Sequence, residues 1–415
     1  MRVAVVGAGV SGLVAAYLLE REHNEVTVFE AGSKPGGHTN TIRVDTAYET
    51  HYVDTGFIVF NDRNYPNFER LLARLGVGWQ PSQMSFGVSD ATGEFEYSSL
   101  SANGLFAIRR HLVSPRFHHM LMEVRRFQRE ARALLTRDAD PSLGEWLEQL
   151  RFSRLFIDRV IVPQASAVWS ADPRQMWTFP ARFLVSFFEN HGVLHLRDRP
   201  KWRTVQGGSH TYVDALTAGL ADRLRTATPV TAIERHDDRV SITPRGGEAE
   251  SFDHVIIAAH SDQALRMLAD ASDREHEILG AIPYQPNEAV LHTDRRLLPR
   301  RRRAWASWNY HLGGEPSGRT RVTYHMNRLQ ALSADREFCV TLNRSEAIDP
   351  EHVIKTIQYD HPVYTSEGAA AQKRHEEISG TGRTHYCGAY WGWGFHEDGV
   401  VSALKVCERL GAHLR

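Results

Sequence analysis

The chain has 415 residues, of which 42% are hydrophobic, so it is long enough for two domains with ample buried apolar surface. Its 49 Lys and Arg residues balance 50 Asp and Glu residues, which argues against a protein that binds nucleic acid through bulk charge. Three cysteines are too few for a disulfide framework, and no apolar run reaches the roughly eighteen residues of a membrane span, so we expect a cytoplasmic protein.

The first thirty residues have the pattern of a nucleotide-binding unit. Residues 3–19, VAVVGAGVSGLVAAYLL, predict a buried strand, a glycine turn and an apolar helix. Gly7 allows the tight turn, Gly9 lets backbone N–H groups approach a pyrophosphate, and Gly12 lets the helix pack closely on the strand. The next strand, VTVFE, ends at Glu30, whose carboxylate can accept hydrogen bonds from both ribose hydroxyls. The alternative interpretation is a glycine-rich turn without a ligand.

A second glycine loop follows this unit. EAGSKPGGHTNT places Gly36 and Gly37 beside the same expected pyrophosphate, and the tripeptide DTG follows at residues 54–56. We expect this loop to distinguish an FAD site from an NAD site.

Helical and extended segments then alternate along the chain. Residues 62–75 and 104–135 have helical periodicity, and SLGEWLEQL at 142–150 opens with a serine cap. Within residues 284–343, the runs AVLHTD, RVTYHMN and FCVTLN alternate in polarity, which predicts a mixed or antiparallel sheet. No repeat of solenoid length is visible.

Four later segments, taken together with the N-terminal motifs, resemble one protein family. They are WRTVQGGSHTYVDAL (202–216), PVTAIE (229–234), FDHVIIAA (252–259) and GAYWGWGFHEDGVVSALKVCERL (388–410). Together with the glycine loops they resemble the flavin-containing amine oxidase superfamily, which includes monoamine oxidases, protoporphyrinogen oxidase and phytoene desaturases. DTGFIVFN, WRTVQGGS and GFHEDG are most similar to a bacterial branch labelled predicted NAD/FAD-binding proteins.

The resemblance implies that the cofactor is FAD, and it implies a set of contact residues. The expected FAD contacts are Gly7, Gly9, Val10, Ser11, Gly12, Glu30, Ala31, Gly36, Gly37, His38, Thr39, Thr55, Gly56, Phe57, Val230, Ala258, Gly388, Asp398, Gly399 and Val400.

The order of these motifs implies two interleaved domains of an α/β protein. A Rossmann-like FAD-binding domain would comprise residues 1–60, 202–265 and 383–415. An α+β substrate-binding domain, a helical cap plus a mixed or antiparallel sheet, would comprise residues 61–201 and 266–382. This is the two-domain architecture of amine oxidases and p-hydroxybenzoate hydroxylase.

The C-terminal motif holds the candidate catalytic residues His396, Trp391 and Trp393. The resemblance implies that Asp398 and Gly399 open a helix whose N-terminal amides face the flavin, which would stabilise the reduced ring. His396 is a candidate acid or base, and the equal alternative is a structural histidine bonded to the backbone. No metal site is expected, because RHEEIS lacks the second His of HExxH.

Three departures from the family pattern affect the expected chemistry. Where many members have a lysine bridged by water to flavin N5, the segment QPNEAVLH has Asn287 or Glu288. Ala389 stands where oxidases often have Glu, and His38 replaces an Arg. A second GxGxxG unit is missing, so electrons are expected to come from the substrate itself.

These features favour hydride transfer from a substrate C–H bond to flavin N5. The substrate is expected to be apolar, such as an unsaturated fatty acyl chain or a polyene, handled by an oxidase, desaturase or isomerase. A small-amine oxidase and a lipid-binding carrier without redox activity are the alternatives. The candidate pocket lining is Phe57, Ile58, Phe60, Asn61, Tyr65, Trp169, Trp308, Tyr324, His325, Asn327, Trp391, Trp393 and His396.

Residues 105–132 have seven Arg against two Glu on an apolar background, and Arg300–Arg303 add a second basic cluster. Such a segment could contact anionic lipid at the inner membrane surface, or it could be an amphipathic core helix with a solvated arginine face. The expected partners are therefore a small-molecule or lipid substrate and no nucleic acid.

Overall fold

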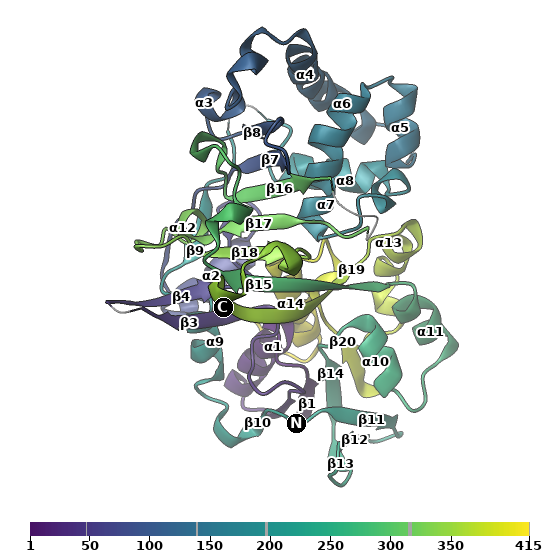
Figure 1. Ribbon diagram of the computed structural model, residues 1–415. Helices are drawn as coiled ribbons and strands as arrows, with labels where there is room; N and C mark the ends of the chain where they lie inside the picture. The colour runs from purple at the N-terminus through teal and green to yellow at the C-terminus, as the bar shows by residue number, and fades with distance from the viewer. Residues whose placement is uncertain (47, 138–139, 196–197, 314–317, 415) are drawn as a thin grey trace.

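One end of the molecule is built on a parallel sheet. The structure, a computed structural model, describes residues 1–46, 48–137, 140–195, 198–313 and 318–414. Five parallel strands lie in the order β10-β2-β1-β14-β20 (Figure 1). They are β1 (Arg2–Val6), β2 (Glu25–Phe29), β10 (Leu224–Arg225), β14 (His254–Ile257) and β20 (Thr384–Tyr386). The three central strands are almost entirely buried, as expected for a parallel sheet covered on both faces.

Helices cover one face of this sheet, and a small sheet with further helices covers the other. The first face packs against α1 (Val10–Arg21), α2 (Pro66–Leu75), α9 (His210–Thr217) and α14 (His396–Arg409). The second face packs against the antiparallel strands β11 (Val230–Arg235), β12 (Val240–Pro244) and β13 (Glu250–Phe252), and against α10 (Ser261–Met267), α11 (Asp273–Gly280) and α13 (Ser366–Gln372). The expected α/β fold with a Rossmann-like unit is confirmed.

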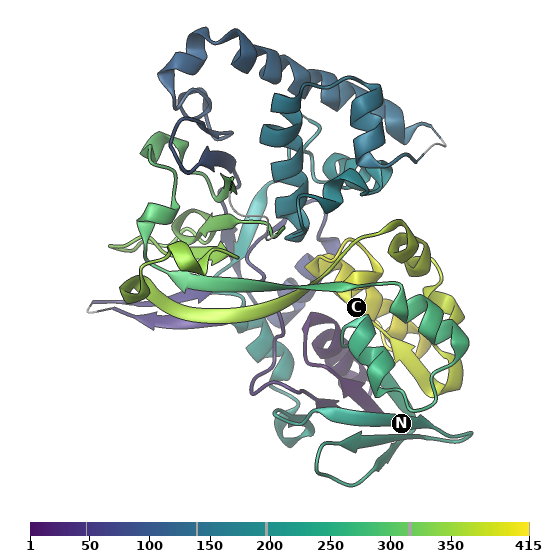
Figure 2. The same cartoon turned by 45° about the vertical axis from the view of Figure 1, so that its right-hand side comes forward.

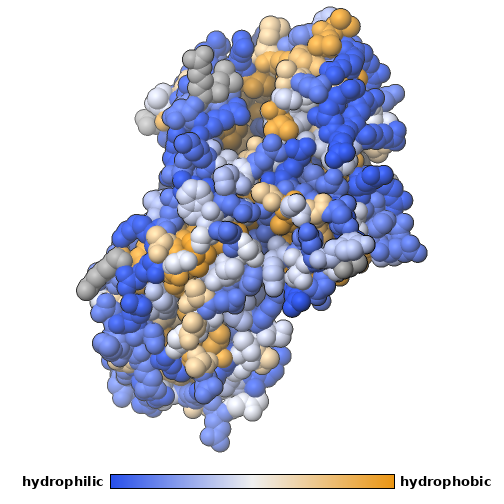
Figure 3. Space-filling view, turned by 90° about the vertical axis from the view of Figure 1, so that its left-hand side faces the viewer, coloured by the Kyte–Doolittle hydropathy of each residue, from blue (hydrophilic) through white to orange (hydrophobic). Residues whose placement is uncertain are grey.

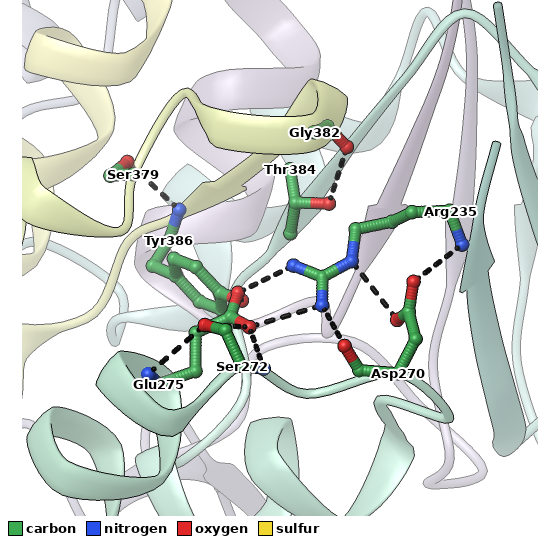
Figure 4. A network of polar contacts seen from close by, with 8 residues as sticks. All are labelled: Arg235, Asp270, Ser272, Glu275, Ser379, Gly382, Thr384 and Tyr386. Atoms are coloured by element: carbon green, nitrogen blue, oxygen red, sulfur yellow. Dashed lines mark hydrogen bonds and ion pairs between the residues drawn. The ribbon is translucent and has the colours of Figure 1, made fainter. Parts of the chain in front are cut away.

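A polar network links the second face to the sheet (Figure 4). The Arg235 guanidinium donates to both Glu275 carboxylate oxygens, at 2.6 and 3.0 Å, and the Tyr386 hydroxyl donates to the same carboxylate at 2.5 Å. Arg235 also pairs with Asp270, and the Glu275 carboxylate accepts the N–H and the hydroxyl of Ser272, the N-cap residue of α11. This network joins β11, α11 and β20, which are far apart in the sequence.

A seven-stranded sheet lies between the parallel sheet and the helical end of the molecule (Figures 1 and 2). Its order is β19-β15-β18-β17-β16-β7-β8, and all pairs are antiparallel except β16 with β7. The predicted extended runs lie in β15, β17 and β18, so this expectation is confirmed. The strands are β7 (Phe86–Asp90), β8 (Glu96–Ser98), β15 (Tyr284–His292), β16 (Trp308–Leu312), β17 (Val322–His325), β18 (Cys339–Leu342) and β19 (Val353–Pro362).

The helical cap follows β8. It consists of α3 (Ala102–Leu105), η1 (Arg109–Val113), α4 (Pro115–Leu135), α5 (Leu143–Gln149), α6 (Arg154–Phe156), the π-helical η2 (Ile157–Ile161), α7 (Val162–Trp169) and α8 (Ala181–Asn190). The cap shares one hydrophobic core with the seven-stranded sheet.

Two helix predictions need new boundaries. The helical stretch expected over 104–135 is broken before Pro115, where the Ser114 side chain caps α4 and proline takes the first turn. The helix expected over 62–75 begins at Pro66, because a residue that precedes proline is disfavoured in the α conformation. Ser142 forms the capping box of α5 with Glu145, as the sequence predicts.

Short strands connect the layers. β3 (Thr41–Asp45) pairs with β4 (Thr50–Asp54), and β9 (Trp202–Val205) pairs with β5 (Phe60–Asn61) and β6 (Trp79–Pro81). The short α12 (Met326–Leu329) follows β17. Among the described residues, no helix is both long enough and apolar enough to cross a bilayer.

Candidate cofactor and substrate site

The three glycines of the first turn differ in the space around them. A Cβ at Gly7, where φ is +104°, would lie 2.7 Å from the Ala258 carbonyl oxygen. A Cβ at Gly12 would lie 2.0 Å from the Gly7 carbonyl oxygen. A Cβ at Gly9 would meet no atom of the described chain within 4 Å. Packing therefore requires glycine at positions 7 and 12, whereas Gly9 faces open space at the start of α1.

The Glu30 carboxylate lies beside this turn. Its Oε2 accepts the Ala8 N–H at 2.7 Å, and its Oε1 accepts the Gly32 N–H at 2.7 Å. The Glu30 carbonyl also accepts the Thr228 N–H, which brings the start of β11 next to the acid. Each carboxylate oxygen keeps a lone pair for a further donor. A ribose hydroxyl is a donor of that kind.

The second glycine loop packs on the first. The Gly36 N–H donates to the Ala8 carbonyl at 2.8 Å, and a Cβ at Gly37 would lie 3.2 Å from the Gly9 Cα. Both glycines have positive φ, +119° and +56°. The two loops that the sequence predicts to flank one pyrophosphate therefore lie side by side.

The C-terminal motif reaches the same place from the other end of the chain. A Cβ at Gly399 would lie 2.8 Å from the Val10 Cγ1 and 3.0 Å from the Ser11 Oγ. The Gly388 N–H donates to the Ser402 hydroxyl at 2.9 Å, which fixes the turn against α14. The first turns of α1 and α14 thus pack against each other. Two helix N-termini, each with unpaired N–H groups and positive partial charge, converge there.

Asp398 closes the first turn of α14. Its carboxylate accepts the Phe395 N–H at 2.9 Å. Burial raises the pKa of Asp398 to about 6, although hydrogen bonds from the backbone of Phe395 and Trp393 oppose this shift. The helix begins at His396, two residues before the Asp398–Gly399 pair that the resemblance places at its start.

His396 faces the second glycine loop. Its Nε2 lies 3.0 Å from the Thr39 Oγ1 and 2.9 Å from the Tyr212 hydroxyl, and its ring stacks on Phe57. Burial lowers the pKa of His396 to about 3, so the ring is neutral at pH 7. In this arrangement the ring binds side chains rather than the backbone.

The three candidate catalytic residues have separate surroundings. Trp391 packs against His375 at a centroid distance of 4.4 Å, on the second face of the parallel sheet. Trp393 lies against the cap, where its carbonyl accepts the Trp169 Nε1–H at 3.0 Å. The structure does not bring Trp391, Trp393 and His396 to one point.

The DTG tripeptide anchors the second loop. The Thr55 hydroxyl donates to the Asn40 carbonyl at 2.7 Å, and the Phe57 N–H donates to the His38 carbonyl at 2.8 Å. Asp54 accepts both the N–H and the hydroxyl of Ser209, at 2.9 Å each. Asp54 thereby ties the loop to the segment WRTVQGGS.

A cluster around His38 was missed by the sequence reasoning. The His38 ring stacks on Tyr359 at 4.8 Å and lies 5.3 Å from the His361 ring. The Tyr359 hydroxyl lies 3.0 Å from the Thr55 Oγ1 and accepts the Asn40 Nδ2–H at 3.0 Å. Burial lowers the pKa of His361 to about 4. The only sequence signal is the alternation of Tyr359 and His361 on β19.

Asn287 joins this cluster from β15. It is fully buried, its Nδ2 lies 3.0 Å from the His361 Nδ1, and its Oδ1 accepts the Asn343 Nδ2–H at 2.7 Å. Its neighbour Glu288 is only partly buried and accepts a long bond from Gln358. Of the two residues expected at the lysine position, Asn287 faces the inside.

The predicted pocket residues lie in several places. Phe60 and Tyr65 belong to the core beneath α2, and Asn61 caps the following turn. Trp308 and Tyr324 pack edge to face in the seven-stranded sheet. The ring of His325 binds Glu337 at 2.6 Å.

Aromatic rings gather where the cap meets the segment before α14. Trp169 is central, with Phe179 and Phe187 at 5.0 Å and Tyr364 at 5.9 Å. The Tyr364 hydroxyl is buried and has no hydrogen-bond partner within the described chain. We call this set the aromatic wall; its members are Trp169, Phe179, Phe183, Phe187, Tyr364, Trp393 and Phe395.

The residues around the glycine loops fit FAD. Gly9 has open space where a pyrophosphate would approach, two helix N-termini converge beside it, and Glu30 lies where an adenosine ribose would bind. The fold and the site therefore define a dinucleotide-binding protein of the flavoprotein class.

Comparisons with known proteins identify the family. The model for flavin-containing amine oxidoreductases matches residues 10–327, and the chain belongs to that family, whose cofactor is FAD. It is 27% identical over 273 residues to a putative flavin-containing monoamine oxidase, AofH, of Mycobacterium tuberculosis, covering 62% of this chain and 56% of that protein. It is 25% identical over 288 residues to the flavin-dependent L-tryptophan oxidase RebO of Lentzea aerocolonigenes, covering 61% and 57%. The chain thus spans little more than half the length of these relatives.

Solved structures share the fold over the whole chain. Cyclohexylamine oxidase from Brevibacterium oxydans has a TM-score of 0.69 at 15% identity, with 99% of each chain covered. A putative protoporphyrinogen oxidase from Exiguobacterium has a TM-score of 0.70 at 20% identity, covering 99% of this chain and 98% of that chain. A fatty acid isomerase from P. acnes that produces CLA has a TM-score of 0.69 at 17% identity, with 98% of each covered.

Proposed function

We propose that the protein uses FAD to take a hydride from a C–H bond of an apolar substrate, of the class of unsaturated fatty acyl chains or polyenes. The observation that carries this proposal is the aromatic wall next to the first turn of α14. Its rings present apolar faces and few polar atoms, which suits a chain or ring held by contact area rather than by a charge. Oxidation, desaturation and isomerisation are all compatible with an apolar surface of this kind.

The residues near the cofactor site have distinct proposed roles. FAD, when bound, supplies the hydride acceptor. The N-terminus of α14 would favour negative charge developing on the reduced ring. Asp398 holds that turn in place by accepting the Phe395 N–H, and Asn287 holds the neutral His361 ring. Trp169, through its bond to the Trp393 carbonyl, fixes the cap against the segment that precedes α14.

Asn287 supports a non-amine substrate. It occupies the position where the family resemblance expects a lysine, and it is engaged on both sides, by His361 and by Asn343. The relatives and folds named above include a fatty acid isomerase besides amine oxidases, so fold alone does not decide the substrate.

The test is anaerobic reduction of the FAD-loaded protein by a panel of pure donors. If the protein is an oxidase or a desaturase, we expect unsaturated fatty acids or polyenes to bleach the flavin band. If it is an isomerase, the hydride returns to the product, and we expect an isomerised product with the band still oxidised. Saturated chains of the same length should give neither result. Bleaching by fatty acids and by no amine supports the proposal. Bleaching by amines alone overturns it in favour of an amine oxidase, which the names of AofH and RebO favour. A protein that refuses FAD but binds acyl chains overturns it in favour of a carrier.

A further inference from the structure

The outer surface of the cap combines exposed apolar side chains with arginines. Val113 is 81% exposed, Met122 62% and Leu112 49%, all on η1 and the first turns of α4. Pro115 begins α4 between them, so Leu112 and Val113 form a corner between two helices. Large apolar side chains this exposed, in one short segment, are unusual for a surface that only faces water.

Arginines surround this corner. Arg109 and Arg110 lie on η1, and Arg116 and Arg125 are exposed on α4. The only acid of residues 100–129 is Glu123, which is 3% exposed and binds the Ser153 N–H. The exposed charge of this segment is therefore entirely positive. We use the name cap surface for residues 109–125, whose exposed apolar members are Leu112, Val113 and Met122.

The fold adds the second basic cluster to the same side. Arg110 donates to the Glu94 carbonyl at 2.7 Å, and Arg300 donates to the Ala91 carbonyl at 2.9 Å, on the same β7–β8 turn. Arg303 donates to the Ala107 carbonyl at 2.8 Å, just before η1. Two arginine groups nearly two hundred residues apart in the sequence thus gather around one turn, where Glu94 is the exposed acid.

Four arginine side chains on this side are held by backbone carbonyl groups, whereas Arg301 pairs with Glu96 at 2.9 Å and Arg302 with Glu337 at 3.9 Å. Arg109, Arg110, Arg300 and Arg303 each donate to a backbone carbonyl, which orders the side chain and leaves its charge. The guanidinium keeps further N–H donors in its planar fork, which match phosphate oxygens.

We propose that the cap surface docks the protein on an anionic lipid bilayer. Leu112, Val113 and Met122 would enter the headgroup region while the surrounding arginines bind lipid phosphates. Exposed apolar residues favour a lipid surface over a nucleic acid, because a phosphate backbone offers no apolar phase. Figure 3 shows hydrophobic residues breaking through the hydrophilic surface at the end of the molecule that carries the cap. This proposal does not depend on which substrate is oxidised.

The cap surface lies at the end of the molecule opposite the parallel sheet and the β11–β13 sheet (Figure 1). Docking there leaves the FAD-binding end in water and the seven-stranded sheet between the two. A matched control is available at the opposite end, where Arg245 is an exposed arginine in the turn after β12.

The test is co-sedimentation of the FAD-loaded full chain with vesicles of phosphatidylglycerol and phosphatidylcholine, compared with pure phosphatidylcholine vesicles. We expect binding to the anionic vesicles that weakens as salt is raised, because exposed charges are screened. The variants Val113→Asp and Arg116→Glu should each lower the bound fraction several-fold, and Arg245→Glu should bind as the wild type does. Circular dichroism and FAD content check that each variant is folded.

Three results would overturn the proposal. One is no binding to anionic vesicles at low salt. Another is equal loss of binding in Arg245→Glu and Arg116→Glu, which would indicate a response to total charge. The last is binding to duplex DNA but not to vesicles, which would show that the arginines serve a nucleic acid.

Discussion

The imidazole of His396 stacks face to face on the ring of Phe57, with centroids 3.5 Å apart and planes 11° apart. The same imidazole bonds Thr39 and Tyr212. Phe57 follows the DTG tripeptide and Thr39 follows the second glycine loop, so His396 holds the start of α14 against both. This relationship makes His396 a positioning residue in our account, and its neutrality follows from its burial.

Replacing His396 should leave the pH dependence of catalysis largely unchanged. Because its pKa is lowered to about 3, His396 does not titrate between pH 5 and 8, and His396→Gln should keep the wild-type shape of the pH profile for flavin reduction. The variant should lose about 1–2 kcal/mol of stability, since two hydrogen bonds and a ring contact change. Loss of a limb near pH 6–7 in the profile would show instead that His396 moves a proton.

The same residue predicts a direction for stability against pH. In the unfolded chain His396 regains an ordinary pKa near 6.5, so between about pH 6.5 and 3 the unfolded state binds more protons than the folded state. The contribution of His396 to stability therefore falls as pH falls through this window. Urea unfolding of the wild type and His396→Gln at pH 7 and pH 5 should show a difference that shrinks at the lower pH.

The contribution of Asp54 to stability should change with pH in the opposite direction. Burial raises its pKa to about 6, against hydrogen bonds from Thr41 and Ser209. Between about pH 4 and 6 the Asp54 carboxyl is more protonated in the folded state than in the unfolded state. Its contribution to the stability of the fold therefore declines as pH rises through that range. Asp54→Asn should nevertheless cost about 1–3 kcal/mol at pH 7, because Ser209, Thr41 and Gln330 all donate to the carboxylate. Thermal unfolding measures both effects, and an Asn variant as stable as the wild type at pH 7 would refute this role.

The network of Figure 4 predicts a coupled loss of stability. Burial opposes ionisation of Glu275, but hydrogen bonds from Arg235, Tyr386 and Ser272 outweigh it and lower the pKa of Glu275. Tyr386→Phe removes one donor and should cost about 1–2 kcal/mol in urea unfolding. In a double-mutant cycle with Glu275→Gln, the two losses should not add, because both residues share one bond. Additive losses would show that the hydroxyl and the carboxylate act independently.

Substitution by alanine should lower thermal stability at Gly12 but not at Gly9. Alanine at position 12 places a Cβ 2.0 Å from the Gly7 carbonyl oxygen, so Gly12→Ala should unfold at a clearly lower temperature or fail to fold. Alanine at position 9 meets no atom of the described chain within 4 Å, so Gly9→Ala should keep the wild-type melting temperature of the FAD-free protein. Equal melting temperatures for the two variants would contradict this assignment of their roles.

Local motifs predicted how the glycine loops pack better than they predicted the surroundings of the aromatic residues. Gly7 and Glu30 lie together because both belong to one strand–turn–helix–strand unit whose geometry is set by nearby residues, and Gly399 joins them through the packing of α14 on α1. Tyr359 and His361 enter the site only because β19 pairs with β15, a contact between residues some seventy positions apart. The separation of Trp391 from Trp393 depends on the backbone at Gly392 between them, where φ is −133° and ψ is −135°, and spacing alone does not encode it.

The most direct test of the central claim is the FAD content of the purified chain, measured for the wild type and for Gly9→Ala after incubation with FAD. We expect one FAD per wild-type chain and a large loss of FAD in Gly9→Ala, with both proteins folded by circular dichroism. The control is Gly280→Ala, at an exposed glycine that ends α11, and it should retain FAD. A wild type that binds no FAD, or a Gly9→Ala variant that binds it as well as the wild type does, would contradict the claim that this turn holds the cofactor.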